Sequence, residues 1–147
     1  MGILGFIGDL ASAPIANLLD CDWKTVSTGS GAYLLLAGPG TKFVYPAGQS
    51  PVFYIGQATG LHGRLNRHRQ EIQGVRNRRR HCIYTPLLEY GSAFGTRFSY
   101  VVAAPKQRPK DLEDELMARF AERYHSLPVA NGAGAWARLR KIIDRMT

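Results

Sequence analysis

The chain has 147 residues, 45% of them hydrophobic, which is enough for one globular domain with its own core but not for two independent domains. A formal net charge of +8 favours polyanionic partners, and charge alone does not separate nucleic acid from an anionic membrane face. The two cysteines, Cys21 and Cys82, lie far apart without metal-ligand spacing. This argues against a zinc motif or a disulfide framework and predicts reduced thiols and a cytoplasmic location.

Residues 1–26 are predicted to form an N-terminal helical arm ahead of a single domain over residues 27–147. The arm begins with an apolar stretch that has no basic start, unlike a signal peptide, and is too interrupted for a membrane span. The interrupting residues are Asp9, Pro14 and Asn17. We therefore expect the apolar side of the arm to pack on the domain, and we expect no membrane partner.

Three strands are predicted after the arm. Ala32–Ala37 is apolar throughout, which is typical of a strand buried on both faces. Val52–Gly56 follows a connection rich in Gly and Pro, in which Lys42–Pro46 either adds a short strand or widens the loop. The two main strands are expected to form an antiparallel hairpin with an enlarged connection. Phe98–Ala104 is a third strand, and Leu87–Tyr90 is expected to pair loosely beside it.

Helical patterns follow the second and third strands. Leu61 and Leu65 begin a helix that is expected to end near Gly74, a natural left-handed cap residue. Pro109–Phe120 predicts a second helix with acids in its first turn, as the helix dipole favours, and Trp136–Met146 predicts a basic amphipathic helix. The pattern therefore predicts an α+β domain, a small sheet with helices around it.

The first helix carries several residues that could take part in catalysis or in phosphate binding. Arg64 and His68 are four residues apart, so they project from one helix face, close to the strand that carries Tyr54. An arginine-rich stretch continues from this helix, and guanidinium groups match phosphate oxygens. A solvated basic face is the alternative, but the nearby polar cluster favours contact with a nucleic-acid backbone. The predicted nucleic-acid-binding residues are Arg67, Arg69, Arg76, Arg78, Arg79 and Arg80.

Several short motifs occur in a definite order along the chain. They are Gly31-Ala32-Tyr33, Tyr54-Ile55-Gly56, Gly60-Leu61-x-x-Arg64-Leu65-x-x-His68, Glu113-x-x-Leu116-Met117 and Pro128-x-x-Asn131. Together they resemble the core of the GIY-YIG nuclease family over residues 31–131. Ala32 replaces the usual Ile or Val, and the connections between the tyrosine motifs and before Asn131 are longer than is common. The chain therefore resembles a divergent, single-domain member.

The resemblance implies a three-stranded antiparallel sheet flanked by helices and a DNase that uses Mg²⁺ or Mn²⁺. It implies that Tyr33 and Tyr54 stand on adjacent strands with their hydroxyls in the site. Arg64 and His68 would come from the first helix, Glu113 would be the single metal ligand, and Asn131 would order the far wall of the pocket. Glu115 is the reserve for Glu113 because the spacing of the acidic helix differs from the family pattern.

Phosphodiester hydrolysis needs a base for the attacking water and positive charge for the phosphate. Tyr33 is predicted to be the general base, with Tyr54 as its positioning partner and His68 sharing or relaying the proton. Arg64 would offset charge on the phosphate. A tyrosine is a poor base unless neighbouring charge lowers its pKa, and Arg64, His68 and the metal ion are expected to do so.

The leading hypothesis is a metal-dependent endonuclease that acts on DNA, with RNA left open as a substrate. The alternative is a catalytically inactive nucleic-acid-binding protein on the same fold, motivated by the arginine cluster and the altered spacings. A third hypothesis is a membrane-surface protein that binds through the N-terminal arm.

Overall fold

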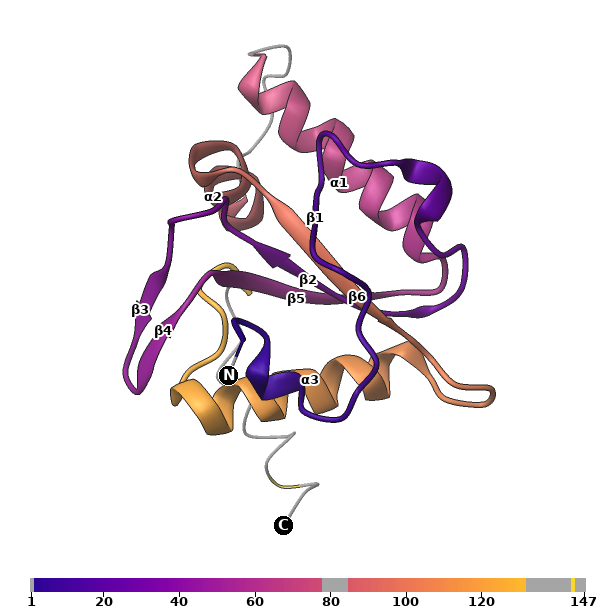
Figure 1. The fold of residues 1–147 in the computed structure, drawn as a ribbon, viewed down its shortest axis with the longest axis vertical. Helices are drawn as coiled ribbons and strands as arrows, with labels where there is room; N and C mark the ends of the chain where they lie inside the picture. The colour runs from indigo at the N-terminus through magenta and orange to yellow at the C-terminus, as the bar shows by residue number, and fades with distance from the viewer. Residues whose placement is uncertain (1, 78–84, 132–143, 145–147) are drawn as a thin grey trace.

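The computed structural model describes residues 2–77, 85–131 and 144. They form a four-stranded antiparallel sheet in the order β1-β6-β2-β5, a separate two-stranded hairpin and three α-helices (Figure 1). The sheet strands are β1 (Ala16–Asn17), β2 (Gly31–Leu36), β5 (Val52–Ala58) and β6 (Arg97–Val102). The hairpin consists of β3 (Phe43–Tyr45) and β4 (Gly48–Ser50), and the helices are α1 (Leu61–Arg76), α2 (Pro86–Phe94) and α3 (Pro109–Tyr124).

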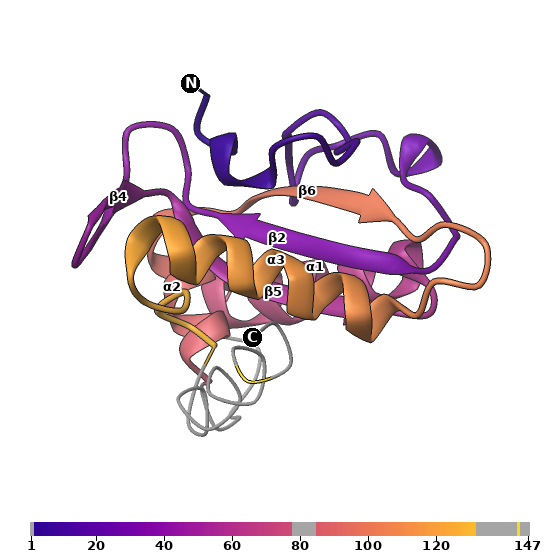
Figure 2. The ribbon, with the colours of Figure 1, turned by 90° about the horizontal axis from the view of Figure 1, so that it is seen from below.

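The sheet lies between α3 on one face and α1 with α2 on the other (Figure 2). Every residue of β2 is buried, because alternate side chains enter the two separate cores. Leu34 packs with α3 residues such as Phe120, whereas Leu35 packs with α1 residues such as Leu65. The prediction of a strand buried on both faces is therefore confirmed.

β2 and β5 pair antiparallel, as predicted, and the enlarged connection between them contains the β3–β4 hairpin. A bulge interrupts their register: Leu35 lies opposite Tyr54, but Leu36 lies opposite Val52. Phe53 is the extra residue, so Phe53 and Tyr54 both pack on the α1 and α2 side of the sheet. The bulge thereby places Tyr54 on the same face as Tyr33.

The predicted helical arm and three-stranded sheet are both wrong. The arm contains two short 3-10 turns, at Gly5–Ile7 and Trp23–Thr25, and between them the two-residue strand β1 pairs with β6 as a fourth strand. Gly8 adopts a left-handed φ of 65°, and Pro14 lacks a backbone N–H, so neither favours a continuous helix. The expected packing does occur, because Ile7 is buried in the core beneath α3.

Two further expectations need correction. Leu87–Tyr90 lies in α2 rather than in a strand, because the Thr85 side chain caps the helix by accepting a hydrogen bond from the Leu88 N–H, and Pro86 suits the first helical turn. Helix α1 continues past Gly74 to Arg76. The predicted helix over residues 136–146 lies outside the described residues, apart from residue 144. No helix among the described residues is both long and apolar enough to cross a membrane.

Candidate functional site

Tyr33 occupies the centre of the candidate site, and it lies directly opposite Gly56 on the neighbouring strand β5. A Cβ atom at position 56 would lie 2.5 Å from both the Cζ atom and the hydroxyl oxygen of Tyr33. The aromatic ring therefore lies over the glycine, where any larger residue would displace it. This contact gives a physical reason for a glycine after Ile55 and directs the phenol along the sheet toward α1.

The Tyr33 hydroxyl meets the first helix at His68. The hydroxyl oxygen lies 2.7 Å from His68 Nε2, a hydrogen bond between residues 35 positions apart in the chain. The Tyr54 ring lies beside both, with its centroid 6.1 Å from that of Tyr33 and 6.2 Å from that of His68. The Arg64 guanidinium is near enough to the Tyr33 hydroxyl to act on its pKa. We call Tyr33, Tyr54, Arg64 and His68 the tyrosine cluster.

Burial sets the protonation of the two inner groups. Tyr33 is only 1% exposed, and this burial, reinforced by Tyr54, raises the pKa of its phenol, although Arg64 acts in the opposite direction. Burial also lowers the pKa of His68 to about 4. Near neutral pH the site therefore contains a protonated phenol and a neutral imidazole that share one hydrogen bond.

This result corrects the expected electrostatics of the tyrosine. The sequence predicts that positive charge on Arg64 and His68 lowers the Tyr33 pKa, but a neutral imidazole supplies no such charge, and burial outweighs Arg64. The other imidazole nitrogen, Nδ1 of His68, is buried and has no hydrogen-bond partner among the described residues. The imidazole is thus oriented through its contact with Tyr33.

The tyrosine cluster has a buried floor and a solvent-facing rim. Tyr33 forms the floor, whereas Arg64 is exposed and Tyr54 is half-buried. A phosphate that approaches this face meets the Arg64 guanidinium and the Tyr54 ring first.

Asn131 braces the strand that carries Tyr54. Its Oδ1 atom accepts a hydrogen bond from the Ile55 N–H at 3.2 Å, and its Nδ2 donates to the Ile55 carbonyl at 2.9 Å. The neighbouring Ala130 N–H donates to the Phe53 carbonyl at 2.8 Å. These bonds give partners to backbone N–H and carbonyl groups on the outer edge of β5, which has no further strand beside it among the described residues. Asn131 is therefore a positioning residue for Tyr54 and Gly56.

Glu113 lies on α3, on the opposite side of the sheet from the tyrosine cluster. It is 6% exposed on α3, and its neighbours Leu112 and Leu116 pack in the core opposite the tyrosine cluster. Because β5 is the edge strand, a carboxylate from α3 reaches the tyrosine face only around that edge. Glu115, the reserve candidate, forms an ion pair with Arg119 at 2.9 Å, and Arg119 also contacts the N-terminal arm. Glu115 is thus engaged on the arm side of α3, and Glu113 remains the predicted metal ligand.

A metal ion at this site would depend on few protein ligands. Among the described residues, no three His, Cys, Asp or Glu side chains come close enough to hold an ion together. Mg²⁺ and Mn²⁺ accept sites with one or two carboxylates, completed by water and substrate phosphate oxygens. A carboxylate such as that of Glu113 has the chemistry of such a single hard ligand, and its place on α3, across the sheet from the tyrosine cluster, leaves its role as the metal ligand a prediction.

The arginine-rich stretch is only partly described. Arg67 pairs with Glu71 at 3.1 Å, and Arg69 donates to Asn66 while lying 5.3 Å from the centroid of the Trp23 ring. Arg76 lies in the last turn of α1. The remaining predicted contacts, Arg78, Arg79 and Arg80, fall outside the described residues. Sequence reasoning assigns no role to Trp23, because no local pattern links it to a helix so much later in the chain.

The structure thus brings four of the predicted site residues together on one sheet face. Asn131 supports them through the backbone, and Glu113 lies on the helix that covers the opposite face. Comparisons of the chain with protein families, with curated proteins and with solved structures found no match.

Proposed function

We propose that the protein is a metal-dependent endonuclease of the GIY-YIG kind that hydrolyses DNA phosphodiester bonds by attack of water. The observation that carries this proposal is the 2.7 Å hydrogen bond between Tyr33 and His68 within the tyrosine cluster. A phenol, an imidazole and a guanidinium on one partly exposed surface match the needs of proton transfer and phosphate binding.

In the proposed reaction Arg64 binds the phosphate and offsets charge as it develops. Tyr54 contacts the attacking water, because Tyr33 is too buried to do so directly. The water proton passes to the Tyr54 oxygen as the Tyr54 proton moves to Tyr33 and the Tyr33 proton moves to His68 Nε2. In this scheme His68 is the final proton acceptor, and Tyr33, predicted from the sequence to be the general base, relays the proton from Tyr54 to His68.

Substrate binding strengthens this relay. A phosphate anion beside the cluster favours the charged imidazolium and so raises the pKa of His68 from the low value that burial gives it. Bound Mg²⁺ or Mn²⁺, held by Glu113, would supply charge compensation and stabilise the departing 3′ oxygen.

A plasmid-nicking assay with Mg²⁺ or Mn²⁺ tests the proposal. We expect Arg64→Ala to reduce cleavage by about 100-fold or more, as the loss of a charge-stabilising donor does in other sites. Glu113→Gln is expected to abolish the metal-dependent reaction. Arg108→Ala is the matched control, since Arg108 is an exposed arginine paired with Asp111 at the start of α3. Unchanged cutting by both Arg64→Ala and Glu113→Gln would refute the site.

A second candidate function is nucleic-acid binding without cleavage. The observation that favours it is the pair of neutral groups at the centre of the cluster, which provides no strong base near neutral pH. Salt-sensitive binding of DNA or RNA, with no cleavage across several divalent ions, would support this alternative.

A further inference from the structure

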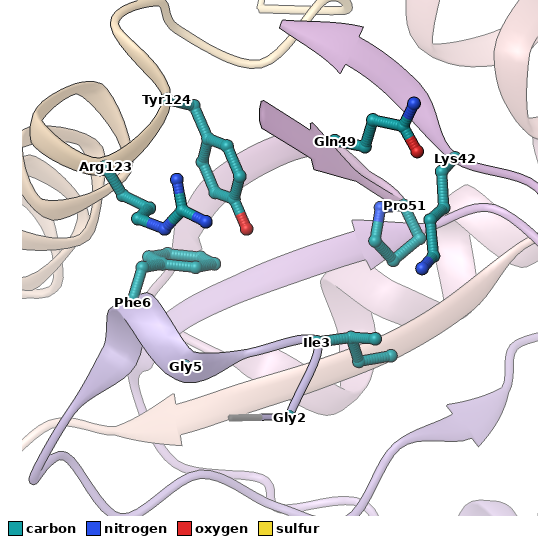
Figure 3. A pocket seen from close by; sticks show the side chains of 9 residues that line it. All are labelled: Gly2, Ile3, Gly5, Phe6, Lys42, Gln49, Pro51, Arg123 and Tyr124. Carbon is teal, nitrogen blue, oxygen red and sulfur yellow. The ribbon is translucent and has the colours of Figure 1, made fainter. Parts of the chain in front are cut away.

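A second candidate site lies on the α3 side of the sheet, on the face opposite the tyrosine cluster. It is a groove of about 220 Å³ between the N-terminal arm, the β3–β4 hairpin and the last turn of α3 (Figure 3). We call it the arm groove. Three segments distant in the sequence build it, so no local pattern predicts it.

The charged residues of the arm groove are both cations. Arg123 and Lys42 stand on opposite sides of the opening (Figure 3), and none of the lining residues is acidic. Arg123 is held in place, because it donates to the Ala47 carbonyl at 3.0 Å and its guanidinium lies 4.8 Å from the centroid of the Tyr124 ring. A pre-ordered guanidinium loses little conformational freedom when it binds an anion.

The remaining wall of the groove carries the apolar side chains of Ile3, Phe6 and Pro51 beside the polar Gln49. Phe6 packs edge-on against Tyr124 with ring centroids 6.3 Å apart, and Pro51 faces them across the opening with Gln49 beside it. An inorganic anion alone would leave this wall unused. A nucleic-acid duplex, whose major groove alone is about 12 Å wide, would not enter a groove of this volume.

We propose that the arm groove binds a nucleotide through a phosphate monoester, with the phosphate between Lys42 and Arg123 and the sugar and base against Phe6 and Pro51. Ammonium and guanidinium groups bind phosphate oxygens, and aromatic faces accept a base. This ligand chemistry comes from two sources, a free mononucleotide or the phosphorylated end of a single strand. The proposal does not depend on cleavage at the tyrosine cluster.

Calorimetric titration of the full chain with AMP, adenosine and inorganic phosphate tests the proposal. We expect saturable AMP binding, with adenosine and phosphate each weaker by about tenfold or more because each uses only part of the groove. Lys42→Gln is expected to weaken AMP binding about tenfold, the usual effect of losing one charge-assisted hydrogen bond. Lys24→Gln removes the same charge from an exposed site in the second 3-10 turn and should leave AMP binding unchanged.

A 5′-phosphorylated trinucleotide and its 5′-hydroxyl counterpart separate the two sources. Tighter binding of the phosphorylated trinucleotide than of AMP assigns the groove to a strand end, and tighter AMP binding assigns it to a free mononucleotide. Equal AMP affinity in the Lys42→Gln and Lys24→Gln variants would overturn the proposal, as would the lack of saturation by AMP and by the phosphorylated trinucleotide alike.

A further variant separates this proposal from the proposed nuclease activity. Arg64→Ala removes a cation of the tyrosine cluster and should leave AMP binding at the arm groove intact, even where it abolishes cleavage. Loss of AMP binding in Arg64→Ala would place the nucleotide at the tyrosine cluster and overturn the arm groove assignment. Failure of the cleavage assay alone would leave it standing.

Discussion

At the scale of single residues, the candidate site depends on the close contact between the Tyr33 ring and Gly56. The Tyr33 ring rests where a side chain at position 56 would otherwise be, and this places its hydroxyl 2.7 Å from His68 Nε2. Tyr33 is buried and His68 is half-buried, and the bond to Tyr33 is the one that orients the imidazole, since His68 Nδ1 has no hydrogen-bond partner among the described residues. Small changes here are therefore expected to alter stability and chemistry together.

Gly56→Ala is expected to destabilise the protein by about 1–3 kcal/mol, because the new methyl group overlaps a buried ring with no room to move. Gly63→Ala is the matched control: Gly63 lies within α1, and its alanine methyl group would meet no atom within 4 Å, so alanine should stabilise the helix by up to about 1 kcal/mol. Urea unfolding measures both variants. Equal stability of the two would show that the Tyr33 ring is not held over Gly56.

The low pKa of His68 predicts a pH dependence of stability. Its folded-state pKa of about 4 lies below the usual histidine value of about 6.5, so between these values the unfolded chain binds the additional proton. Stability should therefore fall as the pH drops from about 6.5 to 4, with up to about 3 kcal/mol attributable to His68. Urea unfolding across this range should show a shallower loss in His68→Gln, and an identical pH profile would contradict the burial of a neutral imidazole.

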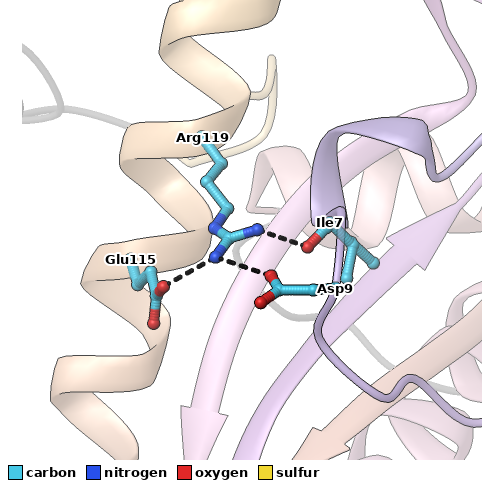
Figure 4. A network of polar contacts seen from close by, with 4 residues as sticks. All are labelled: Ile7, Asp9, Glu115 and Arg119. Atoms are coloured by element: carbon cyan, nitrogen blue, oxygen red, sulfur yellow. Dashed lines mark hydrogen bonds and ion pairs between the residues drawn. The ribbon is translucent and has the colours of Figure 1, made fainter.

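At the scale of elements, β5 is an edge strand that a side chain protects. The side-chain amide of Asn131 forms hydrogen bonds with both the N–H and the carbonyl of Ile55, which lies between Tyr54 and Gly56. The helix α3 is tied to the arm in a similar way, since Arg119 contacts the Ile7 carbonyl, Asp9 and Glu115 (Figure 4). Polar side chains thus join segments that the chain does not connect locally.

Asn131→Ala is expected to cost about 2 kcal/mol, because it removes two hydrogen bonds and leaves the buried Ile55 N–H unsatisfied. Asn131→Asp keeps the acceptor for the Ile55 N–H but sets a carboxylate oxygen against the Ile55 carbonyl, so it should be at least as harmful. Amide hydrogen exchange at Ile55 reports the local effect. Unchanged protection in both variants would mean that the edge is secured by other contacts.

Arg119→Ala is expected to loosen the arm, since a single guanidinium bridges α3 to both Ile7 and Asp9. Limited proteolysis should then cut within residues 2–12 faster than in the native protein. Arg108→Ala serves as the comparison, because the Arg108 ion pair joins residues of α3 and its flank only. Equal cleavage rates in the two variants would argue against a clamp at Arg119.

At the scale of the whole molecule, the protein presents two functional candidates on opposite sides of one sheet. The tyrosine cluster lies on the α1 face and the arm groove on the α3 face, and both carry cations on a chain of net charge +8. Such a charge draws in polyanions over distances of about a Debye length, roughly 10 Å at 0.1 M salt. Binding of nucleic acid should therefore be strongly salt-dependent.

The DNA affinity is expected to fall steeply as the salt concentration rises. In a plot of the logarithm of the binding constant against the logarithm of the salt concentration, Arg64→Ala should reduce the magnitude of the slope by about 1, the contribution of one phosphate contact. Fluorescence anisotropy with a labelled duplex at several salt concentrations measures the slope. Lys24→Gln provides the control for a loss of net charge away from the cluster. Equal slopes in the native protein and Arg64→Ala would place the phosphate contacts elsewhere.

Much of the local structure follows from the sequence, because it depends on neighbours in the chain. The apolar run before Gly38 predicts a buried strand, and Leu61 with Leu65 predicts a helix whose Arg64 and His68 share a face. The approach of Tyr54 to these residues follows from strand–helix continuity. These three predictions concern residues close in sequence, where periodicity carries the information.

The tertiary structure decided the protonation states and the strand pairing that depend on residues distant in the sequence. Burial made Tyr33 a protonated phenol and His68 a neutral base, and no property of either residue alone determines that outcome. Pairing with β6 turned part of the arm into a fourth strand, and a bulge at Phe53 set the face of Tyr54. Composition and periodicity thus determined most of the elements and the grouping of Tyr54, Arg64 and His68, and the resemblance to the GIY-YIG family added Tyr33, Glu113 and Asn131 as candidates. Solvent exclusion and long-range pairing, which depend on the packed chain, decided the protonation and the partners of these residues.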